Sequence, residues 1–218
     1  MIPVKSSLSA LTLGVILFSA VPALAQHAAH AAAVPAASTS KQAETAAALR
    51  DLWVGHVFWA RNVVIASIAK NSEAAAEADK QVVANARAIA KAVEPFYGAD
   101  ASEKLFGLLA EHYGGVKKLL TSTMAGDRSA RQAAVTELNT NAGAIAKFLS
   151  GANPFLPYDT LNAMLLAHGG HHIQQIDQLV ARDYAKEAQT WEAMKNHMHG
   201  IADALAGGLV KQFPDKFG

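Results

Sequence analysis

Apolar residues recur at intervals of three and four along most of this chain, which is the spacing of one face of an α-helix. One such face runs through Leu49, Leu52, Trp53 and Val63, and another through Leu105, Leu109, Val116 and Leu119. No stretch alternates apolar and polar residues over the length of a β-strand. The pattern therefore predicts an all-α protein.

Short segments rich in Gly, Pro, Asn and Asp separate the helical stretches. We expect about six helices: 42–70, 73–93, 100–124, one after Asp127 that ends near 149, one that begins near 158, and 183–213. Pro95 and Gly98 are expected to end the second helix, and Asp100 with Glu103 forms a capping-box pattern at the start of the third. Short connections between helices of similar length predict an up-and-down antiparallel bundle, with four helices forming the core and two flanking it.

Residues 1–25 have the composition of a secretory signal peptide. Lys5 gives a basic start, "LSALTLGVILFSAV" is an apolar segment, and "ALA" at 23–25 fits a cleavage site. Residues 26–41, rich in Ala, His, Ser and Pro, predict a disordered leader that contains His27 and His30, and 42–218 form the helical domain. No second apolar run of roughly 18 residues follows, so we expect a periplasmic or secreted protein without stable membrane insertion once the signal is removed.

Charge and cysteine content narrow the range of functions. Lys and Arg number 19 against 18 Asp and Glu, and no basic cluster of the kind that binds nucleic acid occurs. The chain has no Cys, which excludes disulfides and covalent attachment of c-type haem.

Histidines occupy matching places in four of the predicted helices. His56, His112, His168 and His197 each lie near a helix midpoint, on or beside the apolar face. Midpoints of equal antiparallel helices meet at one height, so the four imidazoles are expected to converge in one layer. His172 follows His168 at i+4, a spacing that places both on one face of a helix. The pattern predicts a metal site with the first four residues as ligands and His172 as an auxiliary ligand.

A single histidine on an apolar face is more often a partly buried core residue whose ring is hydrogen-bonded. Several imidazoles at one depth need a further partner for their nitrogens, such as a metal ion or ordered water. Gly115 and Gly200, on the same faces as histidines, either leave room for imidazoles or a ligand or let helices pack closely. Gly169 and Gly170 could mark a bend.

Three or four neutral imidazoles without a thiolate suit Zn or Cu better than Ni or Fe. The Glu-x-x-His pairs of di-iron bundles are absent from the sequence. Non-covalent haem held by two histidines is a further possibility.

Four segments resemble an uncharacterised family of exported bacterial helical-bundle proteins. They are "LRDLWVGHVFWARNVVIAS" (49–67), "LLAEH" (108–112), "NAGAIAKFLSGANP" (141–154) and "GLVKQFPDKF" (208–217). The resemblance implies that His56, His112, His168 and His197 are shared features, whereas His171, His172 and His199 are peculiar to this chain. It implies no known reaction.

These observations favour an exported transition-metal-binding bundle for storage, scavenging or sensing. Besides haem binding, two alternative functions stay open. One is a metal-dependent hydrolytic enzyme, for which the sequence offers no clear general base. The other is an interaction bundle without metal, whose histidines form a pH-responsive layer. Oligomeric state is not predicted.

Overall fold

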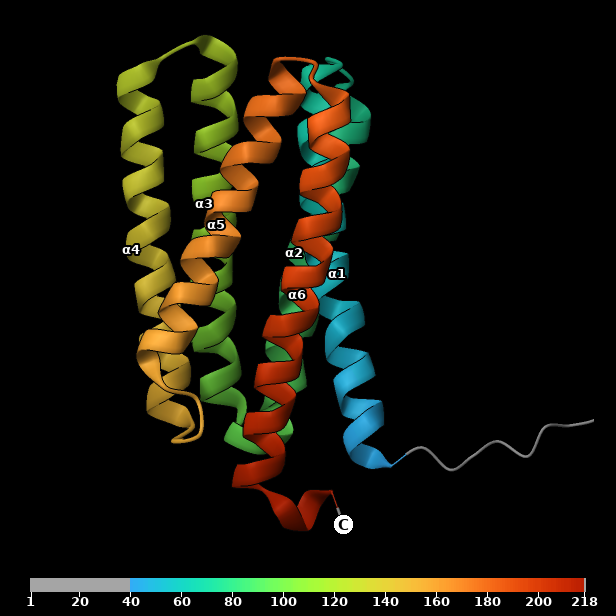
Figure 1. The fold of residues 1–218 in the computed structure, drawn as a ribbon, viewed down its shortest axis with the longest axis vertical. Coiled ribbons are helices and arrows are strands. Elements are labelled where there is room, and N and C mark those ends of the chain that lie inside the picture. The colour runs from blue at the N-terminus through green and yellow to red at the C-terminus, as the bar shows by residue number, and fades with distance from the viewer. Residues whose placement is uncertain (1–39, 218) are drawn as a thin grey trace, which may run out of the picture. The chain divides into compact units, whose positions relative to one another are not determined.

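A computed structural model describes residues 40–217, and within them the fold is all-α, as predicted. Figure 1 shows long helices that run side by side along the bundle axis and reverse direction at short turns. The helices are α1 (Lys41–Ile68), α2 (Ser72–Tyr97), α3 (Ala99–Ala125), α4 (Arg128–Ala152), α5 (Tyr158–Val180) and α6 (Tyr184–Gln212), followed by a short 3₁₀-helix, η1 (Pro214–Lys216). These ranges confirm the six predicted helices to within a few residues.

The predicted signal peptide and nearly all of the predicted leader, including His27 and His30, lie outside the described residues. Among the helices of the described part of the chain, none is long and apolar enough to cross a membrane.

The six helices form three consecutive helical hairpins whose turns have the same construction. The residue that caps the second helix of each hairpin accepts a hydrogen bond from a backbone N–H three residues later, at Asn71, Asp127 and Asp183. The residue before each cap has positive φ: 56° at Lys70, 67° at Gly126 and 60° at Arg182. The step in sequence number from Asn71 to Asp127 equals that from Asp127 to Asp183, and we call this step the repeat spacing.

The repeat spacing also relates buried residues along the helices. Leu49, Leu105 and Leu161 are buried at equivalent places in the first helices, and Ile89, Ile145 and Ile201 in the second helices. The domain is thus an internal threefold repeat of one hairpin, with no insertion between equivalent helix positions.

Packing places the six helices in a closed ring with two layers. Each helix packs against its neighbours in the chain, and α6 closes the ring by packing against α1. The first helices of the three hairpins, α1, α3 and α5, also contact one another. These three are therefore the inner helices, and α2, α4 and α6 lie outside them. The expected division into four core helices and two flanking ones is wrong, because the largest core cluster draws residues from all six.

Two predicted helix ends also differ. Helix α2 continues through Pro95 and ends at Tyr97, and Gly98, whose φ is 86°, is its C-cap. Proline removes only one backbone donor so close to a helix end, and glycine accommodates the positive φ. The predicted capping box is wrong: Gly98 is the N-cap of α3 without a side-chain bond, and Glu103 pairs with Arg87 of α2 instead.

Candidate metal centre

Four histidine side chains meet at the centre of the bundle. His56 of α1, His112 of α3, and His168 and His172 of α5 each offer a ring nitrogen, and these nitrogens all lie within 4.8 Å of one another. None of the four residues is more than 4% exposed. The expectation that imidazoles from separate helices converge is therefore met for three helices, α1, α3 and α5, and not for α6.

The internal repeat explains why three of them meet. His56, His112 and His168 are separated by the repeat spacing and occupy equivalent positions on the three inner helices. Because α1, α3 and α5 contact one another, residues on their shared inner faces approach a common axis. We call these three the axial histidines. Their ring centroids are 5.4 to 6.4 Å apart.

His172 is a fourth member and breaks the threefold pattern. It lies one turn after His168, with the two ring centroids 4.5 Å apart. The equivalent positions in the other hairpins hold Ala60 and Val116, both buried and apolar. The third hairpin therefore adds a second imidazole where the first two hairpins have core side chains.

His197 does not join the group, contrary to the expectation for a ligand. Its Nε2 donates a hydrogen bond to the carbonyl oxygen of Met164 at 2.8 Å, and its ring lies 5.4 Å from that of His171. His197 belongs to α6, an outer helix, so a midpoint position does not bring it to the axis. The sequence pattern indicated the height of the residue along the bundle but not the layer of its helix.

Asn141 of α4 fixes the proton on His112. The Asn141 Nδ2 atom donates to the carbonyl oxygen of Leu108 at 3.0 Å, which leaves Oδ1 as the atom that lies 3.2 Å from His112 Nδ1. An amide oxygen can only accept, so Nδ1 of His112 carries the proton and Nε2 keeps its lone pair. His112 Nε2 is buried and has no hydrogen-bond partner. Metal-binding histidines are commonly oriented in this way by their second nitrogen.

Asn85 of α2 occupies the equivalent place beside His56. Its Nδ2 donates to the carbonyl oxygen of Leu52 at 3.0 Å, and this bond is the counterpart, one repeat earlier, of the bond from Asn141 to Leu108. Asn85 Oδ1 and His56 Nδ1 are both buried without a hydrogen-bond partner. Asn85 therefore repeats the backbone contact of Asn141, but no hydrogen bond joins it to His56.

Burial keeps the four imidazoles neutral. It lowers the pKa of His56 to about 3, with a further contribution from His112, and the pKa of His112 to about 4, against the opposing effect of the Asn141 hydrogen bond. Burial and then the neighbouring imidazoles lower the pKa values of His168 and His172 well below the usual range. Neutral rings retain the lone pairs that a metal ion requires.

The donor set fits a transition-metal ion. Each of the four rings has a buried nitrogen without a hydrogen-bond partner, which is costly unless something binds it. Tetrahedral ligands at metal–nitrogen distances of ~2.0–2.1 Å have nitrogens about 3.4 Å apart. The observed upper limit of 4.8 Å needs only a modest contraction of side chains to reach this geometry.

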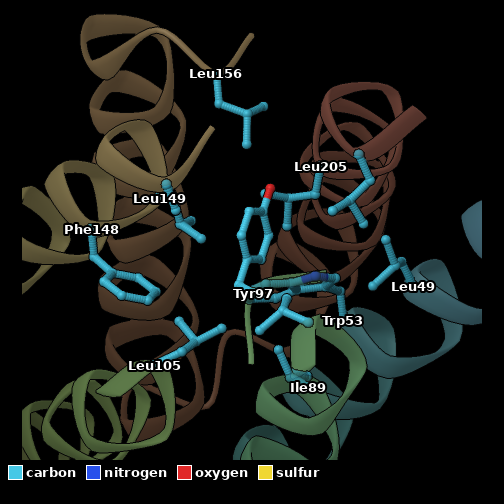
Figure 2. Close-up of a pocket in the computed structure, with 12 residues that line it drawn as sticks. Leu49, Trp53, Ile89, Tyr97, Leu105, Phe148, Leu149, Leu156 and Leu205 are labelled. Atoms are coloured by element: carbon cyan, nitrogen blue, oxygen red, sulfur yellow. The ribbon is translucent and has the colours of Figure 1, made fainter. Parts of the chain in front are cut away.

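A small apolar cavity adjoins the site. Trp53 contacts the His56 ring edge-on, with centroids 6.3 Å apart, and also lines the cavity. Figure 2 shows the rings of Tyr97 and Trp53 in its wall, together with leucines from several helices. Its volume of about 30 Å³ has room for about one water molecule.

Of the glycines near the histidines, Gly115 has a packing role. A Cβ atom at Gly115 would lie 2.8 Å from Leu138 Cδ2 of α4, so this glycine allows close helix packing. At Gly200 the nearest atom would be Met164 Cε at 3.9 Å, an ordinary contact. Helix α5 runs without interruption through Gly169 and Gly170.

The sequence pattern did not indicate Asn85 or Asn141, whereas it did place His172 beside His168. The repeat spacing was the available signal, because it relates the axial histidines to one another and relates Asn85 and Asn141 to His197.

The chain was compared with known family models, curated proteins and solved structures, and none of them matches it. The resemblance to an exported bacterial family therefore stays a prediction.

Proposed function

We propose that this protein binds one transition-metal ion per chain through His56, His112, His168 and His172. One observation carries the proposal: four buried, neutral imidazoles place ligand atoms within 4.8 Å of one another, and each ring has a nitrogen without a hydrogen-bond partner. The orientation of His112 by Asn141 supports it, because second-sphere hydrogen bonds of this kind accompany metal-binding histidines.

The ligands favour Zn²⁺ or copper over nickel or iron. All four donors are imidazole nitrogens, and the group contains no thiolate and no carboxylate. Four protein ligands close a tetrahedral shell, whereas hydrolytic zinc sites keep one position open for water. We therefore propose storage, scavenging or sensing of the ion rather than hydrolysis.

The haem alternative has less support. A porphyrin needs a flat, open slot beside its axial histidine, but the four rings here crowd against one another. The adjoining cavity of about 30 Å³ is far too small for a macrocycle.

We also propose that the protein is exported. The support for export is the signal-peptide composition of residues 1–25, so metal would be bound in the periplasm or outside the cell. N-terminal sequencing of protein from the native host tests this, and a retained residue Met1 would contradict it.

Metal analysis tests the proposed site. Protein purified from its host, and metal-free protein titrated with Zn²⁺ or Cu²⁺, should carry one ion per chain by native mass spectrometry. His112→Ala and His168→Ala should each weaken or abolish binding, whereas His199→Ala should not, because His199 is an exposed residue on α6. Failure of the wild-type chain to bind any of these ions would reject the proposal.

Replacement of His172 distinguishes the fourth ligand from the axial three. His172→Val introduces the residue found at the equivalent position of the second hairpin, Val116, so the core should stay packed. We expect a folded protein that still binds metal through three imidazoles, with an affinity weaker than that of the wild type. An unchanged affinity would remove His172 from the ligand set.

A chelator separates metal binding from a pH-responsive histidine layer. Removal of a bound ion should lower the melting temperature at neutral pH, because the ion binds only the folded chain. An unchanged melting temperature, together with strong acid sensitivity, would favour the layer without metal.

A further inference from the structure

Two histidines of the third hairpin lie next to the candidate metal centre without belonging to it. His171 of α5 and His197 of α6 are both half-buried, so part of each side chain faces solvent. Their ring centroids are 5.4 Å apart, with the ring planes tilted by 56°. His171 directly precedes the buried ligand His172 in the chain.

Both rings have a nitrogen free to bind a ligand. His197 Nε2 donates to the carbonyl oxygen of Met164, so its Nδ1 holds the lone pair. His171 Nδ1 is buried and has no hydrogen-bond partner. The pair thus combines a fixed, correctly protonated imidazole with a second one whose nitrogen is unsatisfied.

The repeat shows that these imidazoles are additions to the basic hairpin. The positions equivalent to His171 hold Trp59 and Gly115, and those equivalent to His197 hold Asn85 and Asn141. The third hairpin alone carries histidine at these two positions, and it alone carries the extra ligand His172. His171, His172 and His197 therefore all belong to the third hairpin, on α5 and α6.

The buried site needs a route for the ion. Its four ligands are at most 4% exposed, so a hydrated ion in solution cannot contact them directly. The α5–α6 side offers such a route, because His171 directly precedes the ligand His172 on α5 and its ring lies 5.4 Å from that of His197 on α6.

We propose that His171 and His197 form a transient loading site that captures a Zn²⁺ or copper ion at the surface and passes it to the four-histidine centre. The ion exchanges bound water for the nitrogens of the pair and then exchanges these for the buried nitrogens. Only coordination bonds form and break, so the transfer needs no oxidant or reductant. This inference rests on the proposed function and adds a kinetic role for two residues outside the ligand set.

The test compares loading rates with final occupancy. His197→Asn restores the residue of the other two hairpins, whose amide bonds the equivalent backbone carbonyl, and His171→Asn removes the second imidazole. Metal-free wild-type, single and double variants are mixed with Zn²⁺ in a stopped-flow instrument, with a fluorescent zinc indicator reporting free ion. Native mass spectrometry after equilibration gives the stoichiometry, and His199→Asn is the matched control on α6.

The double variant should load more slowly than the wild-type chain, yet reach one ion per chain. His199→Asn should load at the wild-type rate. Equal rates in all variants would overturn the loading site and leave the buried centre intact. A lower final stoichiometry in the double variant would also overturn it, since the pair would then be ligands. A wild-type chain that binds no zinc would overturn both proposals.

Discussion

A neutral imidazole has one N–H and one lone pair, and its surroundings decide which nitrogen carries each. At His112 the position of the proton is set by Asn141, whose side chain is oriented by its hydrogen bond to the Leu108 carbonyl. The orientation of His112 at the candidate centre is thus set by a residue of an outer helix, α4.

Asn141→Ala should weaken metal binding without removing a ligand. His112 would lose the acceptor for its Nδ1 proton, and its ring would be free to rotate. Loss of a second-sphere partner typically lowers metal affinity about 10–100-fold. Competition with a chelator of known affinity measures the change. Asn139→Ala, at an exposed position of the same helix, is the control, and equal affinities in the two variants would contradict the assigned role.

At this scale the sequence predicted part of the site. Matching helix midpoints correctly pointed to His56, His112 and His168, because α1, α3 and α5 are all inner helices. The same argument failed for His197, since height along a bundle carries no information about layer. The i+4 relation to His168 did place His172 correctly on the inner face.

Individual helices here pack at distances set by single residues. Gly115 of α3 is buried against Leu138 of α4, whereas its neighbour Gly114 has open space where a side chain would begin. Two adjacent glycines in one helix therefore have different roles, and substitution separates them.

Gly114→Ala should stabilise the protein by up to ~0.8–1.0 kcal/mol, the difference in helix propensity between the two residues. Gly115→Ala should destabilise it by about 1 kcal/mol, because overpacking typically costs about 1–3 kcal/mol and exceeds the propensity gain. Urea denaturation of both variants measures the free energies of unfolding. Changes of the same sign would show that Leu138 yields readily to an added methyl group.

Helix limits were predictable wherever local chemistry decides them. The Asp127 cap and the turn after Ile68 follow from side chains that accept backbone hydrogen bonds. The capping box at Asp100 was not borne out, because Glu103 is held by Arg87 of a neighbouring helix. A contact between the side chains of two consecutive helices, α2 and α3, outweighed a local preference there.

Closure of the ring joins the first and last hairpins. Arg61 of α1 makes two hydrogen bonds of 2.6 and 2.7 Å to the carboxylate of Glu187 on α6, and Gln175 of α5 donates to the same group at 2.9 Å. The Glu187 side chain is only 3% exposed. Arg61 is the first cause of the lowered pKa of Glu187, so this carboxylate stays charged inside the bundle.

Arg61→Met should destabilise the fold by about 3 kcal/mol, the low end of the cost of leaving one member of a buried ion pair unpartnered. The low end applies because Arg61 itself is 28% exposed. Arg50→Met is the control: Arg50 links the same two helices through Asp203, but that pair is exposed. Equal losses in the two variants, measured by chemical denaturation, would show that burial of Glu187 is not the cause.

The metal-free protein should lose stability as the pH falls from about 6.5 to about 4.5. Unfolded histidine takes up a proton near pH 6.5, whereas burial lowers the pKa values of His56 and His112 to about 3 and 4 in the folded chain. The unfolded state therefore binds more protons in this window, and the free energy of unfolding decreases as the pH falls. Melting temperatures at several pH values measure the slope.

His172→Val should flatten that slope, since one fewer buried imidazole would distinguish the folded from the unfolded state. His199→Ala, at an exposed position, should preserve it. A melting temperature independent of pH across this window would contradict burial of neutral histidines.

The all-α class and the antiparallel connections could be predicted from the spacing of apolar residues and from the turn residues. The two-layer ring could not, because it depends on contacts between helices far apart in sequence.

The constant repeat spacing of the three hairpins suggests how such a fold can be assembled from separate chains. Equivalent hairpins occupy equivalent places in a closed ring, and each contributes one of the axial histidines. The three axial histidines therefore meet because of how the hairpins pack, and not because of the links between them. Three separate copies of a single hairpin could close the same ring as a homotrimer with cyclic symmetry, because most homo-oligomers are closed and symmetric. Joining them in one chain allows what a homotrimer forbids: one hairpin can carry histidines that the other two lack.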